Sequence, residues 1–281
     1  MKSKKLLNRH RLRPKKSWGQ NFLISNPIIK KIVDALNPTP QDWVLELGAG
    51  AGALTEPLCQ KAEKVFALER DPDLLQLLKR EFGSIPNLEI IPADAASFPL
   101  KSIKAPRPLL IAGNLPYQIS APILFHLQKE RKYFSRAILM LQKEVAERLT
   151  ANPNSGKNYS ILSVVFSAFF KVEKVFNVSK NNFYPRPKVD SAIVKLTSLK
   201  EPTAPIEDEK FFIQTVKMAF SQRRKTLYNN IRSHYPTLSK EKIITLLQEI
   251  GLDTQQRGET LSVQQFANLA KKLKLARKLT K

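Results

Sequence analysis

The chain has 281 residues, with 47 Lys and Arg against 24 Asp and Glu, so its formal net charge is +23. This length can bury a large core, and no apolar run is long enough to span a membrane. A surface this basic repels itself unless it meets a polyanion; nucleic acid is the first candidate partner, and an acidic membrane surface is the runner-up. Cys59 is the only cysteine and the three histidines share no ligand spacing. These counts argue against a disulfide framework and a metal site, and they favour a reducing, cytoplasmic setting.

Residues 1–17 are predicted to form a basic N-terminal arm. The stretch carries many cations, no acidic residue and no apolar core of a secretory signal. We expect the arm to contact phosphates; an organellar transit peptide is the alternative, although the stretch is short and poor in serine. A helix is predicted next, over about 27–36, with Asn26 as its cap and Pro27 at its first position.

A strand, a glycine-rich turn and a helix are predicted around residues 44–52, VLELGAGAG. An apolar run ends at Gly48. Glycine and alanine then alternate through Gly48 and Gly50, and residues 53–59 resume a helical pattern. Residues without a Cβ atom let a ligand lie against the backbone. Gly48, Gly50 and Ala53 also match the dinucleotide fingerprint, so the loop indicates a nucleotide-like cofactor without saying which one.

Further strands alternate with helical segments and are predicted over 65–68, 88–91, 109–112 and 137–141, with Asp71 capping the helix after the first of them. Such alternation favours parallel pairing, so we expect an α/β fold with a doubly wound sheet that binds ligands beyond the carboxyl ends of its strands. Four polar or glycine positions follow four successive strands: Gly48, Glu69, Asp94 and Asn114. Glu69 lies about twenty residues after the glycine loop, the spacing at which a carboxylate binds ribose hydroxyls. Taken singly, Glu69 or Asp94 is equally well read as a helix cap or a loop acid.

The rest of the chain changes character after a linker over 201–205. Before the linker we predict a helix over 159–170, strands over 172–178 and 192–196, and between these strands a proline-stiffened loop over 183–190. After it only helices are predicted, with a basic cluster at Arg223, Arg224 and Lys225. The predicted domains are therefore the arm (1–17), a sheet domain (18–200) and a small helical domain (201–281).

The tetrapeptide Asn114-Leu115-Pro116-Tyr117 at the end of the fourth strand carries the most specific chemistry. It resembles the N/D-P-P-Y/F motif of adenine and cytosine amino-methyltransferases. The exocyclic amine of adenine is a poor nucleophile, because its lone pair is delocalised into the ring. The Asn114 amide oxygen and the Leu115 carbonyl can accept hydrogen bonds from that amine, so catalysis would depend on positioning and fixed dipoles. Pro116 would fix the backbone, and Tyr117 would offer a ring on which a flipped base stacks.

Several segments together are similar to the bacterial small-subunit ribosomal RNA adenine N6-dimethyltransferase family: 19–23 (GQNFL), 46–50 (ELGAG), the tetrad, 183–191 and 220–227 (FSQRRKTL). The resemblance implies a Rossmann-like, S-adenosyl-L-methionine-dependent methyltransferase domain with a helical C-terminal domain. It also implies dimethylation of two adjacent adenines in a hairpin loop near the 3′ end of 16S rRNA, coupled to small-subunit assembly. The implied partner is this rRNA within a 30S precursor, with no membrane, and the enzyme is expected to be a monomer.

The resemblance also implies a role for each matched residue. The methionine end of the cofactor would be bordered by Gln20, Asn21 and Leu23. The glycine loop would support the cofactor through Gly48 and Gly50. Glu69 would bind the ribose, and Asp94 would bind the adenine amine. Asn114 would lie between cofactor and target. The catalytic set would be Asn114, Leu115, Pro116, Tyr117 and Phe183, with Tyr117 and Phe183 sandwiching the target base. The RNA would be bound by Arg223, Arg224 and Lys225.

Three alternatives stay open at this point. The nearest is a large-subunit rRNA methyltransferase of the macrolide-resistance type, in which isoleucine usually replaces Leu115 and the basic motif over 221–227 is not expected. The second is a non-catalytic RNA-binding assembly factor, against which the intact Asn114, Glu69 and Asp94 count. The third is a nicotinamide-dependent oxidoreductase, which the glycine loop permits but the tetrad and the charge of +23 disfavour.

Overall fold

The computed structural model describes residues 2–15, 18–153 and 155–278. The chain divides into two compact units, which we call the sheet unit (1–146 and 171–198) and the helical unit (147–170 and 199–281). This division differs from the predicted domains in two ways. The sheet unit includes the N-terminal residues, and it lacks residues 147–170. Residues 147–170 belong to the helical unit because helix α7 (Ile161–Phe169) contacts α8 (Glu209–Ala219) and α11 (Val263–Lys278).

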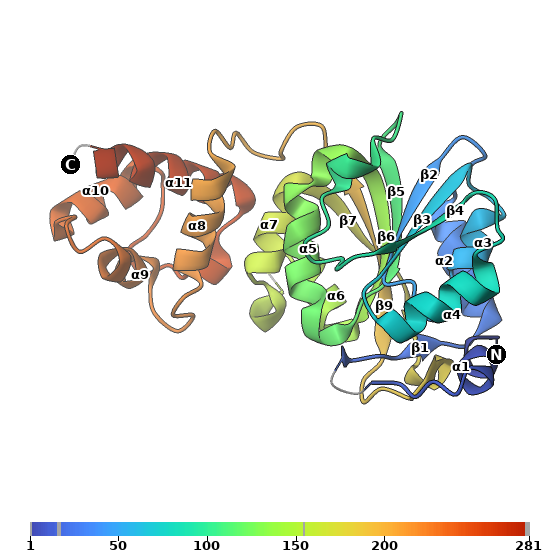
Figure 1. Ribbon diagram of the computed structural model, residues 1–281. Helices are drawn as coiled ribbons and strands as arrows, with labels where there is room; N and C mark the ends of the chain where they lie inside the picture. The colour runs from blue at the N-terminus through green and yellow to red at the C-terminus, as the bar shows by residue number, and fades with distance from the viewer. Residues whose placement is uncertain (1, 16–17, 154, 279–281) are drawn as a thin grey trace. The chain divides into compact units, whose positions relative to one another are not determined.

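The sheet unit is built on a seven-stranded sheet in the order β4-β3-β2-β5-β6-β9-β7 (Figure 1). Its strands are β2 (Trp43–Leu47), β3 (Lys64–Glu69), β4 (Leu88–Pro92), β5 (Leu109–Asn114), β6 (Phe134–Gln142), β7 (Phe170–Val178) and β9 (Ser191–Ser198). The five strands predicted first, β2 to β6, pair in parallel. Strand β9 runs antiparallel to β6, so the α/β prediction is confirmed and the sheet is mixed.

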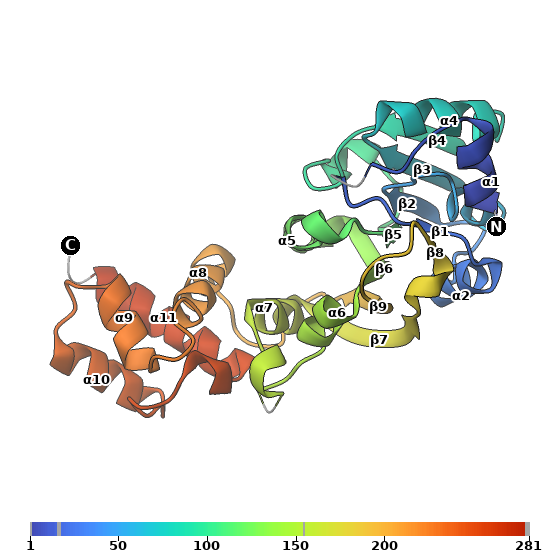
Figure 2. The ribbon, with the colours of Figure 1, turned by 90° about the horizontal axis from the view of Figure 1, so that it is seen from below.

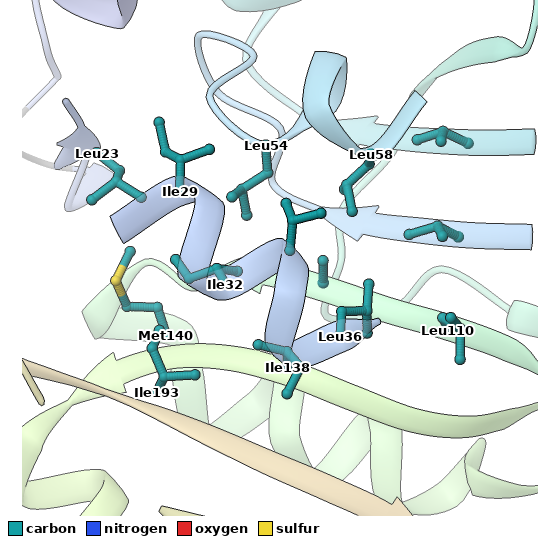
Figure 3. Packing of buried hydrophobic residues seen from close by; sticks show 14 of the residues in the cluster. Leu23, Ile29, Ile32, Leu36, Leu54, Leu58, Leu110, Ile138, Met140 and Ile193 are labelled. Atoms are coloured by element: carbon teal, nitrogen blue, oxygen red, sulfur yellow. The ribbon is translucent and has the colours of Figure 1, made fainter. Parts of the chain in front are cut away.

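Helices cover both faces of this sheet, as Figure 2 shows: α2 (Asn26–Leu36) and α4 (Pro72–Phe82) on one face and α5 (Ser120–Lys129) on the other. The short helix α3 (Thr55–Cys59) follows the glycine loop and contacts α2. Helix α2 buries the apolar side that its spacing predicts; Figure 3 shows Ile29, Ile32 and Leu36 against strand residues that include Leu110, Ile138 and Met140. The helix begins one residue earlier than predicted, with Ser25 at the cap position and Asn26 inside it.

The N-terminal residues do not form a separate arm, which corrects the first predicted domain. Residues Lys2–Arg9 form helix α1, whose Leu6 and Leu7 are 4% and 1% exposed. Both leucines belong to a core cluster with Phe22, Ala49 and Ala51 of the glycine loop, and apolar residues of α4. A free arm was predicted because cations dominate the composition of this segment. The structure differs because two leucines on one side of a helix are enough to pack it against the core.

The helical unit confirms the predicted helices after the linker: within the described residues up to 278, no strand follows it. Besides α7, α8 and α11 it contains α9 (Leu227–His234) and α10 (Lys240–Glu249), while α6 (Lys143–Leu149) spans the boundary between the units. Aromatic rings join these helices: Phe169 meets Phe212 edge-on at 6.2 Å, and Phe220 stacks on Phe266 at 6.1 Å. Among the described residues, no helix is both long and apolar enough to cross a membrane.

Candidate functional site

The register of the sheet brings the predicted strand-end residues to one edge. Leu47 pairs with Leu68 on one side and with Gly113 on the other, and Glu69 pairs with Pro92. The residues that follow these strands therefore line one pocket: Gly48, Glu69, Asp94 and Asn114. The pocket encloses about 740 Å³, counting its open mouth, which is within the range of sites for small organic ligands.

The glycine loop forms one wall of this pocket with a backbone that favours glycine. Gly48 has φ +70° and Gly50 has φ +58°, both in the left-handed region. A Cβ atom placed on Gly48 would meet no protein atom within 4 Å and would stand in open space beside the pocket. At Gly50 a Cβ would lie 3.3 Å from the Phe22 ring. The loop is thus shaped to let a ligand approach the backbone at Gly48.

Glu69 ties the glycine loop to the turn after β3. Its Oε2 accepts a hydrogen bond from the Gly50 N–H, and its Oε1 accepts from the N–H groups of Arg70 and Asp71, all at 2.8 Å. Burial raises the pKa of Glu69, although these three N–H groups favour the ionised form. A carboxylate has about four acceptor positions, so Glu69 can accept a further hydrogen bond while it holds the loop.

Glu46 is a second buried carboxyl group below the loop, and sequence reasoning assigned it no role. It is 2% exposed, and its Oε2 accepts a hydrogen bond of 2.6 Å from the Thr55 hydroxyl, the first residue of α3. Burial raises the pKa of Glu46 to about 8; the Thr55 bond opposes this change and the charge of Glu69 adds to it. At neutral pH Glu46 is therefore mostly protonated, and it joins β2 to α3 across the glycine turn.

Asp94 lies at the opposite side of the pocket, with Arg70. The Arg70 guanidinium and the Asp94 Oδ2 are 2.9 Å apart, and Asp94 Oδ1 accepts from the Ala96 N–H at 2.9 Å. Burial raises the pKa of Asp94, but the Ala96 N–H and Arg70 outweigh it and the net pKa is lowered. The Arg70 guanidinium carbon also lies 4.4 Å from the centre of the Trp18 ring. Asp94 thus presents an ionised acceptor beside an aromatic wall.

Lys15 together with Trp18–Asn21 closes the pocket from the N-terminal side, and we call these residues the N-terminal strap. Trp18 to Asn21 all line the pocket. The strap is fastened to Asp71, which is 1% exposed: its Oδ1 lies 2.7 Å from Lys15 Nζ, and its Oδ2 accepts from Gln20 Nε2 at 2.7 Å. Gln20 Oε1 accepts in turn from the Lys15 N–H at 2.8 Å. Gln20 therefore holds the strap as well as lining the pocket.

The tetrad lies where the strap meets the end of β5. Asn114 Nδ2 donates to the Asn21 carbonyl at 2.9 Å, which orients the amide and leaves its Oδ1 as an acceptor. The Leu115 N–H donates to the Met140 carbonyl at 3.2 Å, and Leu115 is 1% exposed. The Tyr117 hydroxyl bonds to Ser191 Oγ at 2.7 Å, which holds the ring at the pocket. This arrangement can orient an amino group without any strongly basic side chain.

Two predicted site residues, Leu23 and Phe183, lie in the core instead of the pocket wall. They face each other in the antiparallel pair of β1 (Phe22–Leu23) and β8 (Phe183–Tyr184), and they are 1% and 4% exposed. Successive side chains of a strand point to opposite sides. Phe22 lines the pocket, so Leu23 points away from it, and Phe183 follows its partner Leu23 into the α2 cluster. The expected sandwich of a base between Tyr117 and Phe183 is not present in this geometry.

The basic cluster of the helical unit is also divided. Arg223 is internally bonded: its Nε bonds to Glu259, and its terminal nitrogens donate to the carbonyls of Lys157 at 2.7 Å and Gly156 at 2.9 Å. Arg224 and Lys225 are exposed. Arg223 thus stabilises the helical unit while its side chain stays 38% exposed, and its predicted contact with RNA stays a prediction. Arg224 and Lys225 are available to a partner.

Several site residues were missed by sequence reasoning. Trp18 and Arg70 stack at the pocket mouth, and Asp71 was recognised only as a helix cap, which it also is. The available signal was adjacency: Trp18 directly precedes the Gly-Gln-Asn segment, and Arg70 and Asp71 directly follow Glu69. No sequence spacing links Lys15 to Asp71, since 56 residues separate them.

A known protein family and curated relatives match nearly the whole chain. The model of the ribosomal RNA adenine dimethylase family matches residues 11–275. Ribosomal RNA small subunit methyltransferase A of Myxococcus xanthus is 42% identical over 269 residues, 95% of this chain and 94% of that protein. The protein of the same name from Bacillus licheniformis is 39% identical over 281 residues, 98% of this chain and 96% of its own.

Solved structures give the same answer at the level of the fold. A dimethyladenosine transferase from Plasmodium falciparum has a TM-score of 0.73 at 30% identity, covering 92% of this chain and 98% of that one. The 23S rRNA methyltransferase ErmE has a TM-score of 0.68 at 26% identity, covering 90% and 99%. The Rossmann-like methyltransferase fold and the cofactor class are thereby confirmed, and the oxidoreductase and non-catalytic alternatives fall away. The family model and the curated relatives match nearly the whole chain, and one pocket holds the glycine loop, Glu69, Asp94 and Asn114. This chain therefore belongs to the ribosomal RNA adenine dimethylase family, enzymes that use S-adenosyl-L-methionine as methyl donor.

Proposed function

We propose that this enzyme dimethylates N6 of two adjacent adenines in a hairpin loop near the 3′ end of 16S rRNA, within a 30S precursor. The observation that carries the proposal is the oriented Asn114 amide, whose Oδ1 remains an acceptor at the pocket end of β5. The names of relatives at 35–42% identity support the small subunit as the substrate. A monomer acting in the cytoplasm, and coupling of the reaction to subunit assembly, complete the proposal.

The residues of the pocket divide between cofactor and target. S-adenosyl-L-methionine, when bound, supplies an electrophilic methyl group. Glu69 would accept from its ribose, Asp94 from its adenine amine, and Gly48 and Gly50 would let it approach the backbone. The strap residues Gln20 and Asn21 would border its methionine end. The described contacts support this division because each of these residues lines the same pocket.

The chemistry at the target amine follows from hydrogen-bond acceptors. Asn114 Oδ1 and the Leu115 carbonyl would accept the two N–H bonds of the adenine amine, which favours a more tetrahedral nitrogen with its lone pair directed at the methyl group. Pro116 holds the backbone of Leu115, and the Tyr117 ring, fixed by Ser191, would stack on the flipped base. Phe183 is 4% exposed and does not line the pocket in this structure, so its stacking on the base stays a prediction.

The catalytic pocket alone does not select the RNA. The same fold occurs in a 23S rRNA methyltransferase, ErmE, and any adenine that is flipped out of a stack could enter such a pocket. Discrimination must then come from surfaces that contact RNA outside the pocket, and we assign part of it to the exposed Arg224 and Lys225.

The direct test is incubation with labelled S-adenosyl-L-methionine and unmodified small or large subunits, followed by mapping of the label. We expect two adjacent dimethyladenines in 16S rRNA and no label in large-subunit rRNA. Label in the large subunit would contradict this proposal and would favour a large-subunit rRNA methyltransferase of the macrolide-resistance type. The Asn114→Ala variant is the internal control: it should retain its fold and its rRNA affinity but lose about a hundredfold or more in kcat, the scale of a lost preorganised dipole.

A further inference from the structure

A second cationic hollow lies in the sheet unit, apart from the cofactor pocket. It encloses about 640 Å³, counting its open mouth, and four of its lining residues are cations: Lys101, Lys104, Arg107 and Lys132. No acidic residue is among its lining residues, which otherwise are apolar or Tyr133. We call these four side chains the amino-edge cluster.

The amino-edge cluster lies at the end of the sheet opposite to the catalytic residues. Arg107 stands just before β5, which begins at Leu109, and Lys132 stands just before β6, which begins at Phe134. Asn114 is at the other end of β5. Six residues of strand separate the two ends of β5, and at about 3.3 Å per residue this is about 20 Å.

The segment that carries three of these cations, 98–108, is held rigidly. It contains Pro99, Pro106 and Pro108, which restrict its backbone. Helix α5 and the residue after it tie down its first part: His126 Nε2 contacts the Phe98 carbonyl at 2.6 Å, and Glu130 accepts from the Leu100 N–H at 3.0 Å. The cations therefore project from a preorganised frame, which lowers the entropic cost of binding.

Lys104 ends the short 3-10 helix Leu100–Ile103 within this frame. Its φ of +50° is that of a left-handed cap residue, and its N–H donates to the Lys101 carbonyl.

The cations of the cluster also lack counter-charges. Among the described residues no ion pair is formed by Lys101, Lys104 or Arg107, and Lys132 lies 5.0 Å over the Tyr133 ring. By contrast, Lys30 and Lys61 both pair with Asp34, at 2.6 and 2.8 Å. Glu130 lies beside the hollow on the Leu100 N–H, but among the described residues it forms no ion pair with the cluster. The gathered cations therefore repel one another, and a polyanion would relieve this repulsion.

We propose that the amino-edge cluster is a second RNA-contact surface, which binds the phosphodiester backbone of the rRNA substrate. This inference rests on the proposed function, since it takes the same RNA as its ligand. Lysine and arginine contacts to phosphates position an RNA without reading its bases. Because the cluster is about 20 Å from the catalytic end of β5, a short hairpin that fills the pocket does not reach it, and a folded rRNA does.

The test compares two triple variants that remove equal charge. Lys101→Gln/Lys104→Gln/Arg107→Gln removes three cations of the cluster, and Lys30→Gln/Lys61→Gln/Lys171→Gln removes three ion-paired cations elsewhere in the sheet unit. Affinity for protein-free, full-length 16S rRNA is titrated against salt. We expect the cluster variant to bind about tenfold or more weakly and to lose about 2–3 from the slope of log K against log salt, while the control stays near the parent.

Separate readouts keep this proposal distinct from the proposed function. Cofactor affinity and methylation of a short 3′-hairpin RNA should be unchanged in the cluster variant. Equal losses of rRNA affinity in the two variants would show that only net charge matters and would overturn the proposal. Normal rRNA binding by the cluster variant with weaker binding to assembled small subunits would also overturn it, in favour of an acidic protein partner. Failure of the proposed function would appear instead as absence of 16S methylation by the parent enzyme.

Discussion

At the residue scale, two carboxyl groups on neighbouring strands support the glycine loop in different ways. Glu69 accepts three backbone N–H groups and remains an acceptor toward the pocket, whereas Glu46 holds a proton and bonds to Thr55 behind the loop. The pKa of both groups is raised by burial, but only Glu69 has N–H donors that favour its anion. Environment therefore separates Glu69, whose anion is favoured by N–H donors at the pocket, from Glu46, a buried carboxylic acid behind the loop.

The proton on Glu46 predicts a pH dependence of stability. The folded-state pKa of about 8 lies above the usual 4.5, so the stabilising contribution is complete below pH 4.5 and is lost as the pH rises through about 8. The Glu46→Gln variant keeps an acceptor for Thr55 and cannot ionise. Thermal melts between pH 5 and 9 should show the parent losing Tm relative to Glu46→Gln as the pH rises; parallel profiles would contradict a protonated Glu46.

Gly48 allows a test of the cofactor wall with a matched control. Gly48→Ala places a methyl group beside the pocket at φ +70°, and Gly251→Ala places one in open space at φ +69° on the surface turn after α10. Both carry the left-handed strain of roughly 1–2 kcal/mol. Only Gly48→Ala should also weaken S-adenosyl-L-methionine binding in calorimetry, by about tenfold. Equal affinities in the two variants would show that the cofactor does not approach Gly48.

At the element scale, the N-terminal segment serves the pocket in two ways. Helix α1 seats Leu6 and Leu7 against the glycine loop and α4, and the strap closes over the cofactor side. Both depend on α4: its apolar residues receive the leucines, and its cap residue Asp71 receives Lys15 and Gln20. Helix α4 thus links the N-terminal segment to the pocket, and we expect changes at this link to alter cofactor binding.

Asp71 and Asp73 provide a paired test of the strap. Both carboxylates lie 2.7 Å from Lys15 Nζ, but only Asp71 also accepts from Gln20 and is buried. Asp71→Asn retains a good N-cap while it removes the charge that fastens the strap. We expect about a tenfold loss of cofactor affinity for Asp71→Asn, matching one charge-assisted hydrogen bond, and a smaller loss for Asp73→Asn. Calorimetry that ranks the two variants equally would contradict an anchoring role for Asp71.

At the scale of the whole molecule, the basic surface of the chain separates into bonded and available cations. Arg223 is bonded within the helical unit, while Arg224, Lys225 and the amino-edge cluster project from two different units. A net charge of +23 therefore describes RNA affinity only in part, since some of that charge stabilises the fold.

The two roles predicted within the basic motif can be separated by mutation. Arg223→Gln should lower the stability of the protein by about 1–3 kcal/mol, because the guanidinium bonds to Glu259 and to backbone carbonyls are lost. Arg224→Gln/Lys225→Gln should leave Tm unchanged and reduce the salt slope of rRNA binding by about 2. Thermal melts and binding titrations on both variants check this; an unchanged slope in the double variant would remove Arg224 and Lys225 from the RNA interface.

The sequence by itself determined the α/β class, the helical C-terminal region and the main wall of the pocket. Gly48, Glu69, Asp94 and Asn114 could be predicted because parallel strands place their carboxyl ends together, so a local pattern suffices. Only the tertiary structure decided which of the predicted residues have buried or hydrogen-bonded side chains. Leu23 and Phe183 turn into the core because of their strand pairing, Arg223 is occupied by carbonyls 64–67 residues away, and Leu6 and Leu7 bury a segment that composition described as a free arm. Burial and hydrogen-bond partners depend on residues distant in the chain, and no spacing along the sequence encodes them.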